Sequence, residues 1–254
     1  MNRNLFFSVL LAGGVLCNFS SCKSRYCVAD ISRTRYEVTS ALDAAPDKQA
    51  VAFLQPYTGK VDSIMGQKLG VSDQFLTRTG MESLLGNLLT TVLRESASSY
   101  LNGQPAQIGI MNRGGIRSNL PKGTITLRDV FDVSPFDNYL CVMQVSGKQL
   151  LDIFHDLALY KLCIQGGARV VAKTDGTIVS ATINGEPIDP TKTYTLATID
   201  YLAEGNDKLS SMKTISGKQI TKITLRDCII NYIKGQTAAG KHISEQLDGR
   251  FVIK

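Results

Sequence analysis

The sequence predicts an α+β fold, because segments with helical periodicity and segments with hairpin signals both occur along the chain. Apolar residues from Leu84 to Leu93 repeat at helical spacing. In contrast, the strand-like segments 169–173 and 178–183 flank Asp175-Gly176, a pair typical of tight β-turns. Hairpins mixed with helices favour α+β over a regular βαβ series. The 254 residues, 43% of them hydrophobic, suffice for one large domain or two small ones.

The first half of the chain predicts two helices among three strands. Tyr36 and Val38 share one face of a short strand. Pro56 lies inside the first helical segment and should split or kink it, because proline has no backbone N–H to donate. Residues from Ile108 to Met111 are apolar and indicate a buried strand. The expected elements are strands at 33–40, 71–77 and 106–111, and helices at 47–67 and 82–101.

The second half predicts short strands around three helices. Ser146 is a good N-cap for the second of these helices. Asn184-Gly185 predicts a further tight turn after the hairpin. The expected elements are a turn at 121–124, helices at 127–133, 148–160 and 225–234, and strands at 139–145, 169–173, 178–183, 193–199 and 251–253.

The N-terminus has the three-part pattern of an export signal. Arg3 supplies a positive charge, and the apolar stretch from Leu5 to Phe19 is too short to span a membrane. Phe19-Ser20-Ser21-Cys22 then resembles the lipobox of bacterial lipoproteins. The sequence therefore predicts an exported protein, periplasmic or at the cell surface, that a lipid anchors to a membrane.

These signals divide the chain into three regions. We expect a signal peptide at 1–21, a tether at 22–32 whose lipidated first residue is Cys22, and one domain at 33–254. Two alternatives stay open. Cys17 is a weaker candidate for lipidation, because the bulky Leu16 precedes it, and plain secretion with cleavage nearby would leave no anchor.

Charge and cysteine usage exclude some classes of function. The 28 Lys and Arg residues give a formal charge of +6 but are spread along the chain, which argues against a nucleic-acid duplex as partner. Cys141, Cys163 and Cys228 lie in apolar runs and form no CxxC pair, so they read as buried hydrophobes rather than metal ligands. The sequence leaves open whether two of them form a disulfide.

The segment that follows the buried strand at 108–111 carries a candidate binding motif. Asn112 offers one acceptor and two donors. Gly114 and Gly115 allow a sharp turn and the close approach of a ligand, because no Cβ is in the way. Arg117 provides a planar fork that fits a phosphate or carboxylate. The alternative is an ordinary glycine turn beside a surface arginine.

Two further stretches each place an aromatic ring near a polar side chain. Phe136 and Asn138 lie in SPFDN, between two regular elements. Tyr201 and Asp207 lie in TIDYLAEGND, where the chain leaves a strand. Taken singly, an aromatic in a loop is more often a lid on the core, and an aspartate after a glycine is more often a cap.

Taken together and in this order, the motifs resemble the C-terminal domain of the 5′-nucleotidase family. The likeness runs from about Tyr36 to the C-terminus. It rests on ESLLGNLLTTVL, on NRGGIR, which matches an Asn-x-Gly-Gly-Ile-Arg signature, on SPFDN, and on GEPIDPTKTYTLATIDYLAEGND. The resemblance implies a four-layer α/β/β/α single domain.

The resemblance also implies roles for single residues. Phe136 and Tyr201 would sandwich a nucleobase, and Asp207 would accept hydrogen bonds from the ribose hydroxyls. Asn112 and Arg117 match residues that lie against the base and the phosphate or sugar.

Two more side chains follow from the resemblance, and one loop departs from it. Asn138 matches an amide near the base. Arg78 approximates a family arginine before the Glu-Ser helix, although its spacing to Glu82 is one residue longer. The family's Gly-Gly-Asp-Gly reads Gly-Asn-Asp-Lys at 205–208.

The metal ligands of the family's separate calcineurin-like domain are not matched here. That domain holds two metal ions through Asp, His and Asn, and this chain has two histidines, His155 and His242, outside any such motif. We therefore expect no cofactor in this chain and a divalent metal pair in a separate calcineurin-like metallophosphoesterase chain. The chain would bind the nucleotide for that partner. The alternatives are a non-catalytic nucleoside- or nucleotide-binding surface lipoprotein and a surface protein with an inert pocket.

Overall fold

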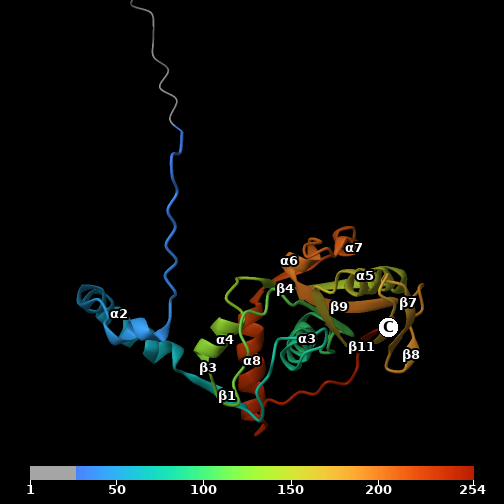
Figure 1. Ribbon diagram of the computed structural model, residues 1–254. Helices are drawn as coiled ribbons and strands as arrows, with labels where there is room; N and C mark the ends of the chain where they lie inside the picture. The colour runs from blue at the N-terminus through green and yellow to red at the C-terminus, as the bar shows by residue number, and fades with distance from the viewer. Residues whose placement is uncertain (1–26) are drawn as a thin grey trace, which may run out of the picture. The chain divides into compact units, whose positions relative to one another are not determined.

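The computed structural model describes residues 27–254 (Figure 1). The signal peptide expected at 1–21 and the lipidation site at Cys22 lie outside the described residues. The chain divides into two units, one up to Phe53 and one compact unit from Leu54 to Lys254. No helix within residues 27–254 combines the length and the apolar character that crossing a membrane requires.

The first unit differs from the strand expected at 33–40. Residues 27–39 form neither helix nor strand, and the 3-10 helix η2 (Ser40–Ala44) follows. The prediction was wrong because no described residue pairs with this segment and its side chains are exposed, so alternation alone cannot hold it extended. Helix α2 (Lys48–Met65) then runs through Pro56 as one helix rather than two.

A five-stranded sheet forms the centre of the compact unit. Its order is β10 (Gln219–Thr224), β4 (Tyr139–Ser146), β9 (Thr193–Ile199), β2 (Ile108–Asn112) and β5 (Cys163–Gly166). The pair β2–β9 is parallel and the other pairs are antiparallel. Strands β2 and β5 are buried along their whole length, which places the sequence motif after β2 directly against the core.

Two smaller sheets contain the other strands of the described residues. The four-stranded sheet has the order β11 (Phe251–Ile253), β6 (Arg169–Ala172), β7 (Ile178–Ile183) and β8 (Glu186–Pro187). Its β6–β7 pair confirms the hairpin predicted around Asp175-Gly176. Strands β1 (Lys68–Ser72) and β3 (Gly123–Thr126) pair separately. The strand expected at 71–77 is therefore found at 68–72, with only an isolated bridge at Leu76, and the turn expected at 121–124 overlaps the start of β3.

Helices pack on the central sheet from two sides. Helix α3 (Leu84–Ser96) contacts β2 and β5, and α5 (Gly147–Tyr160) contacts β4 and β9. Figure 1 shows these two helices on opposite sides of β9. Ser146 caps α5 as predicted and forms a capping box with Gln149. The remaining helices are η3 (Ala97–Tyr100), α4 (Leu127–Val133), α6 (Asp200–Ala203), α7 (Ser210–Lys213) and α8 (Leu225–Ala238). The α+β class is confirmed.

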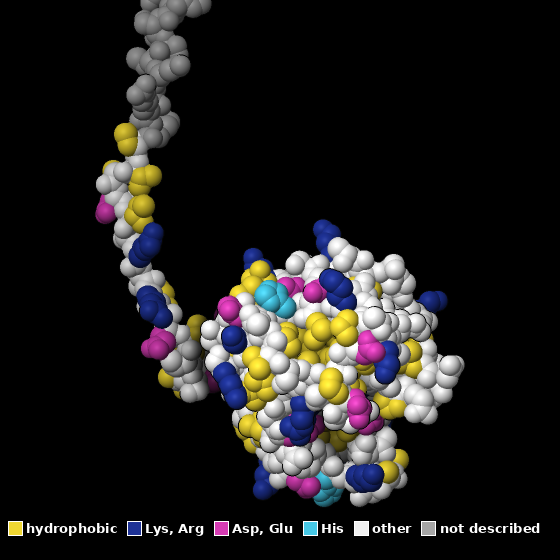
Figure 2. Space-filling model, turned by 90° about the vertical axis from the view of Figure 1, so that its right-hand side faces the viewer, with side chains coloured by type: hydrophobic (Ala, Val, Ile, Leu, Met, Phe, Trp, Pro, Cys, Tyr) yellow, Lys and Arg dark blue, Asp and Glu magenta, His cyan; other side chains and the backbone are white. Residues whose placement is uncertain are grey.

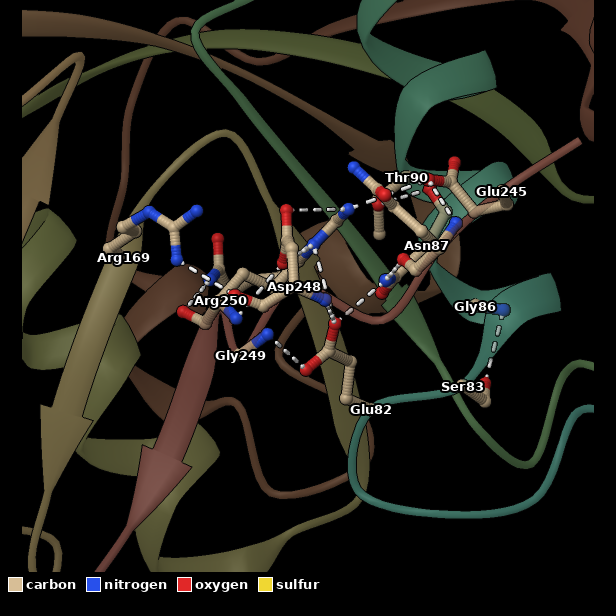
Figure 3. A network of polar contacts seen from close by, with 12 residues as sticks. Glu82, Ser83, Gly86, Asn87, Thr90, Arg169, Glu245, Asp248, Gly249 and Arg250 are labelled. Carbon is tan, nitrogen blue, oxygen red and sulfur yellow. Dashed lines mark hydrogen bonds and ion pairs between the residues drawn. The ribbon is translucent and has the colours of Figure 1, made fainter.

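A polar network fastens the C-terminal segment to the start of α3 (Figure 3). The Glu82 carboxylate accepts hydrogen bonds from the backbone N–H groups of Asp248 (2.8 Å) and Gly249 (3.1 Å). Asn87 donates to Glu82 (2.9 Å) and to the carbonyl of Gln246 (2.8 Å). Because these backbone groups would otherwise lack partners, the network fixes the approach to β11.

Candidate functional site

A hollow of about 350 Å³ opens at one edge of the central sheet. Strands β2 and β9 are parallel, so both end at this edge, and the antiparallel β4 begins there. The loops that carry the three sequence motifs therefore meet, although they lie far apart in the chain. The residues that line the hollow are Asn112, Gly114, Gly115, Phe136, Asn138, Tyr201 and Asp207.

Asp207 is the centre of the polar wall. Its two carboxylate oxygens accept hydrogen bonds from the Asn112 amide (2.7 Å) and from the Tyr201 hydroxyl (3.0 Å). The hydrogen bond to Asp207 raises the pKa of Tyr201, because the anion favours the protonated phenol. Each carboxylate oxygen keeps further lone-pair capacity. The carboxylate is thus held in place and can still accept bonds from a ligand.

The two aromatic rings of the hollow remain accessible. Phe136 is 45% exposed and Tyr201 is 40% exposed, so neither ring is a lid buried in the core. Asp200 accepts from the backbone N–H of Tyr201 (2.8 Å) and from that of Tyr139 (3.1 Å), and Asn206 donates to the Tyr201 carbonyl (2.8 Å). These bonds fix the backbone while leaving the ring face open.

Arg226 positions the loop that carries Phe136, a role that sequence reasoning missed. It donates to the backbone carbonyls of Ser134 and Phe136 (3.1 Å each) and pairs with the carboxylate of Asp137. Its guanidinium lies 4.6 Å from the centre of the Phe131 ring. The only signal in the sequence is an arginine in the first turn of a helix, which is too common to select.

Glycine at 115 is required by a close contact inside the motif. A Cβ there would lie 2.4 Å from Oδ1 of Asn112, whereas a Cβ on Gly114 would meet open space. The same Oδ1 atom is buried and has no hydrogen-bond partner among the described residues. Asn112 therefore contributes one oriented donor to Asp207 and one unsatisfied acceptor beside the hollow.

The two arginines expected at the site lie at its rim and beside it. The Arg117 guanidinium is 5.8 Å from the centre of the Phe136 ring, and it donates to the Gly114 carbonyl (3.1 Å). Arg78 lines a neighbouring hollow of about 330 Å³ that shares Gly114 and Asp207 with the first. Seven of the nine predicted binding residues thus line one hollow, and the other two flank it.

Neither histidine contributes to this site. His155 Nδ1 lies 2.9 Å from the carbonyl of Gly176, and His242 Nδ1 lies 2.7 Å from a carboxylate oxygen of Asp73. Within residues 27–254, no three His, Cys, Asp or Glu side chains are arranged to hold a metal ion. On the face drawn in Figure 2, basic and acidic side chains are interspersed rather than gathered by sign.

Residues 65–215, more than half of the chain, match the family model described as the 5′-nucleotidase, C-terminal domain. The chain belongs to this 5′-nucleotidase C-terminal domain family. The silent protein UshA(0) of Salmonella typhimurium is 31% identical over 172 residues, which cover 65% of this chain and 30% of that protein. Cell wall protein Lmo0130 of Listeria monocytogenes is 28% identical over 236 residues, which cover 82% and 30%.

A solved 5′-nucleotidase precursor from Thermus thermophilus superposes with a TM-score of 0.71 at 25% identity, over 83% of this chain and 44% of that one. The chain thus spans less than a third of the two curated relatives and under half of the solved structure. In this 5′-nucleotidase C-terminal domain, the loops of Asn112, Phe136 and Tyr201 all lie within the matched residues.

Proposed function

We propose that this chain binds a nucleotide by its base and ribose for a 5′-nucleotidase-type phosphohydrolase whose catalytic metals lie on a separate chain. The observation that carries the proposal is Asp207, held by Asn112 and Tyr201 in a hollow that also contains the exposed ring of Phe136. A fixed carboxylate beside flat apolar surfaces matches the two halves of a nucleoside.

The rings of Phe136 and Tyr201 bind the base by stacking. Base–aromatic stacking is typically worth about 1–3 kcal/mol per base and tolerates any base, because every base has a π-face. Asn138 lines the same hollow and offers an amide to the base edge.

The polar wall binds the sugar. Asp207 accepts hydrogen bonds from two ribose hydroxyls, and such charge-assisted bonds are stronger than neutral ones. The amide of Asn112 donates to Asp207 and so holds its carboxylate in place for these hydroxyls. Arg117 and Arg78, at the rim and beside it, orient the phosphate.

The partner is a calcineurin-like metallophosphoesterase chain. No three His, Cys, Asp or Glu side chains of residues 27–254 are arranged to hold a metal ion, so we assign the metal pair to a second polypeptide. A divalent metal pair on that partner would activate water and stabilise the leaving oxygen. The contribution of this chain is positioning, which can lower a barrier by several kcal/mol without touching the bond that breaks.

Export and lipid anchoring at Cys22 belong to the same proposal. The leader pattern supports them, and one relative is named a cell wall protein. Labelling cells with a fatty-acid analogue should tag the wild-type chain and not the Cys22→Ala variant. A tag retained in that variant would contradict anchoring at Cys22.

The function is tested by two measurements on the purified chain. Calorimetry with AMP and UMP should show binding without a partner. Adding the metallophosphoesterase chain and a divalent cation should then release phosphate, which neither chain does alone. Binding without release in the mixture would favour the non-catalytic lipoprotein, and absence of binding by a folded chain would overturn both.

A further inference from the structure

A second hollow, of about 300 Å³, lies near the other end of β2. Three arginines line it: Arg94 from α3, Arg169 from β6, and Arg250 from the segment before β11. Arg94 donates through Nε to the carbonyl of Ala106 (2.9 Å), just before β2 begins. The first hollow (the nucleotide hollow, lined by Asn112, Phe136 and Asp207) lies where β2 ends. The two hollows are therefore separated by the length of the strand.

The charge of Arg250 is already matched by carboxylates. It pairs with Asp248 through two nitrogens, at 2.9 and 3.2 Å, and lies 3.8 Å from Glu82 and 3.6 Å from Glu245. Figure 3 shows these groups around its guanidinium. Asp248 is the carboxylate in the wall of the hollow, and it is engaged by Arg250.

The charges of the other two arginines are not matched in this way. No carboxylate of the described residues lies within ion-pair distance of Arg94, and its terminal nitrogens have no hydrogen-bond partner there. Arg169 donates to a neutral group, the carbonyl of Asp248 (2.8 Å), and its charge helps to lower the pKa of the Asp248 carboxyl without forming an ion pair with it. Burial and then the nearby Arg250 lower the pKa of Arg94, and the attraction of Glu95 offsets them only in part.

The backbone at Gly167 passes close to Arg94 and to the start of β2, and this close approach requires a glycine. Gly167 has a φ of +99°, and a Cβ there would lie 1.9 Å from the carbonyl oxygen of Gln107 and 3.1 Å from Nε of Arg94. Only glycine fits, because any side chain would displace the strand start and the guanidinium together.

We propose that this hollow is a binding site for a phosphate group, held by Arg94 and Arg169. Two guanidinium forks that form no ion pair with a carboxylate of the described residues suit a phosphate group, whose charge as an ester is about −1.5 to −2 at pH 7, whereas a single carboxylate carries only one charge. The group belongs either to free inorganic phosphate or to an organic phosphomonoester. The site does not depend on the nucleotide hollow, since the two share no residue.

Calorimetry with inorganic phosphate tests the proposal on the whole chain. Wild type should bind, and Arg94→Gln with Arg169→Gln should weaken binding at least about tenfold, because each removes a charge-assisted pair. Arg169→Gln alone covers the case that the double variant does not fold, since Arg169 is an exposed side chain. Arg128→Gln, an exposed arginine paired with Asp62, is the control and should bind like wild type.

Two further arms separate the outcomes. Phe136→Ala should leave phosphate binding unchanged, so failure of the nucleotide site and failure of this site are distinguishable. Glycerol phosphate that competes with inorganic phosphate identifies an ester as ligand, and absence of competition identifies the free ion. No phosphate binding by wild type, or equal binding by the Arg169→Gln variant, would overturn the proposal.

Discussion

The two hollows at the ends of β2 are opposites in how their polar groups are satisfied. In the nucleotide hollow, the one carboxylate, Asp207, is held by two donors before any ligand arrives, and Phe136 presents an open face. In the second hollow (the arginine hollow, lined by Arg94, Arg169 and Arg250), neither Arg94 nor Arg169 forms an ion pair with a carboxylate of the described residues. The first hollow presents an open aromatic ring and a carboxylate with two donors, and the second presents guanidinium groups that form no ion pair with a described carboxylate.

The difference shows two ways in which a sheet edge can support a ligand. Asp207 already has two hydrogen-bond donors, which hold its side chain in place without a ligand. Binding therefore loses little side-chain entropy at Asp207, and the fixed position favours selectivity. Burial and the nearby Arg250 make the charge of Arg94 unfavourable, and a bound anion would relieve that cost. Variants at one end should therefore alter nucleotide binding alone, and variants at the other end phosphate binding alone.

The largest expected effect is that of Asp207→Asn. Asparagine tolerates the φ of 51° at this position, so the fold should persist. The new side-chain NH2 group would face one of the two donors, the Asn112 amide or the Tyr201 hydroxyl, and could not accept its hydrogen bond. The negative charge would also be lost. Bonds to charged groups are worth up to about 3 kcal/mol, so AMP affinity should fall about 100-fold by calorimetry. Asp175→Asn, in the β6–β7 turn, is the matched control, and an equal loss there would refute the assignment.

Phe136→Ala should follow in size. Loss of one stacking surface should weaken AMP binding by roughly 2 kcal/mol, or about 30-fold. The melting temperature should hardly change, because the ring is 45% exposed. Phe75→Ala, which removes a ring 52% exposed and outside the hollow, should bind as wild type. If both variants bind equally well, the hollow does not stack a base.

A matched glycine pair tests the geometry of the motif. Gly115→Ala places its methyl group 2.4 Å from Oδ1 of Asn112 and should push that side chain off Asp207. AMP affinity should fall about tenfold, the loss expected for one charge-assisted hydrogen bond. Gly114→Ala meets open space and should retain affinity. The reverse order of the two variants would show that Asn112 does not orient Asp207.

The sequence predicted the local elements better than the long-range ones. The stripe on α3, the cap at Ser146 and the hairpin at Asp175-Gly176 depend on neighbouring residues, and all three are present. Strands β5 and β10 were missed. The first has four residues that end in glycine, and the second carries lysine and threonine at a sheet edge, so neither shows a clear period of two.

The sequence predicted the residues that line the first hollow, but not the contacts that hold its loops in place. Asn112, Phe136 and Asp207 could be found because each belongs to a recognisable motif. The contacts of Arg226 with the Phe136 loop join residues about 90 positions apart, and the bond from Tyr201 to Asp207 depends on how one loop closes. No local pattern encodes such contacts, because tertiary packing decides them.

Arg226 therefore tests whether a residue affects binding by positioning the Phe136 loop rather than by contacting the ligand. Arg226→Gln should lose the pair with Asp137 and loosen the loop while leaving the ring of Phe136 intact. Ordering the loop on binding would then cost roughly 1 kcal/mol, so AMP affinity should fall about fivefold. Arg226→Lys should restore part of it, since lysine still donates to a carbonyl. A contact role would instead require a direct effect of Arg226 on base preference, seen as a changed ratio of AMP to UMP affinity.

The smallest effect concerns pH and the Tyr201 hydroxyl. The pKa of Tyr201 is raised because the hydroxyl donates to Asp207, so the folded chain favours the protonated phenol. That contribution to stability is complete below the ordinary tyrosine pKa of about 10 and is lost as pH rises through the raised value. Urea unfolding of wild type and Tyr201→Phe should therefore differ by a constant amount from neutral pH to about pH 9 and converge above about pH 10. A difference that does not shrink as pH rises above about 10 would mean that Asp207 does not accept this bond. The preorganised wall that distinguishes the nucleotide hollow from the arginine hollow would then lose its main support.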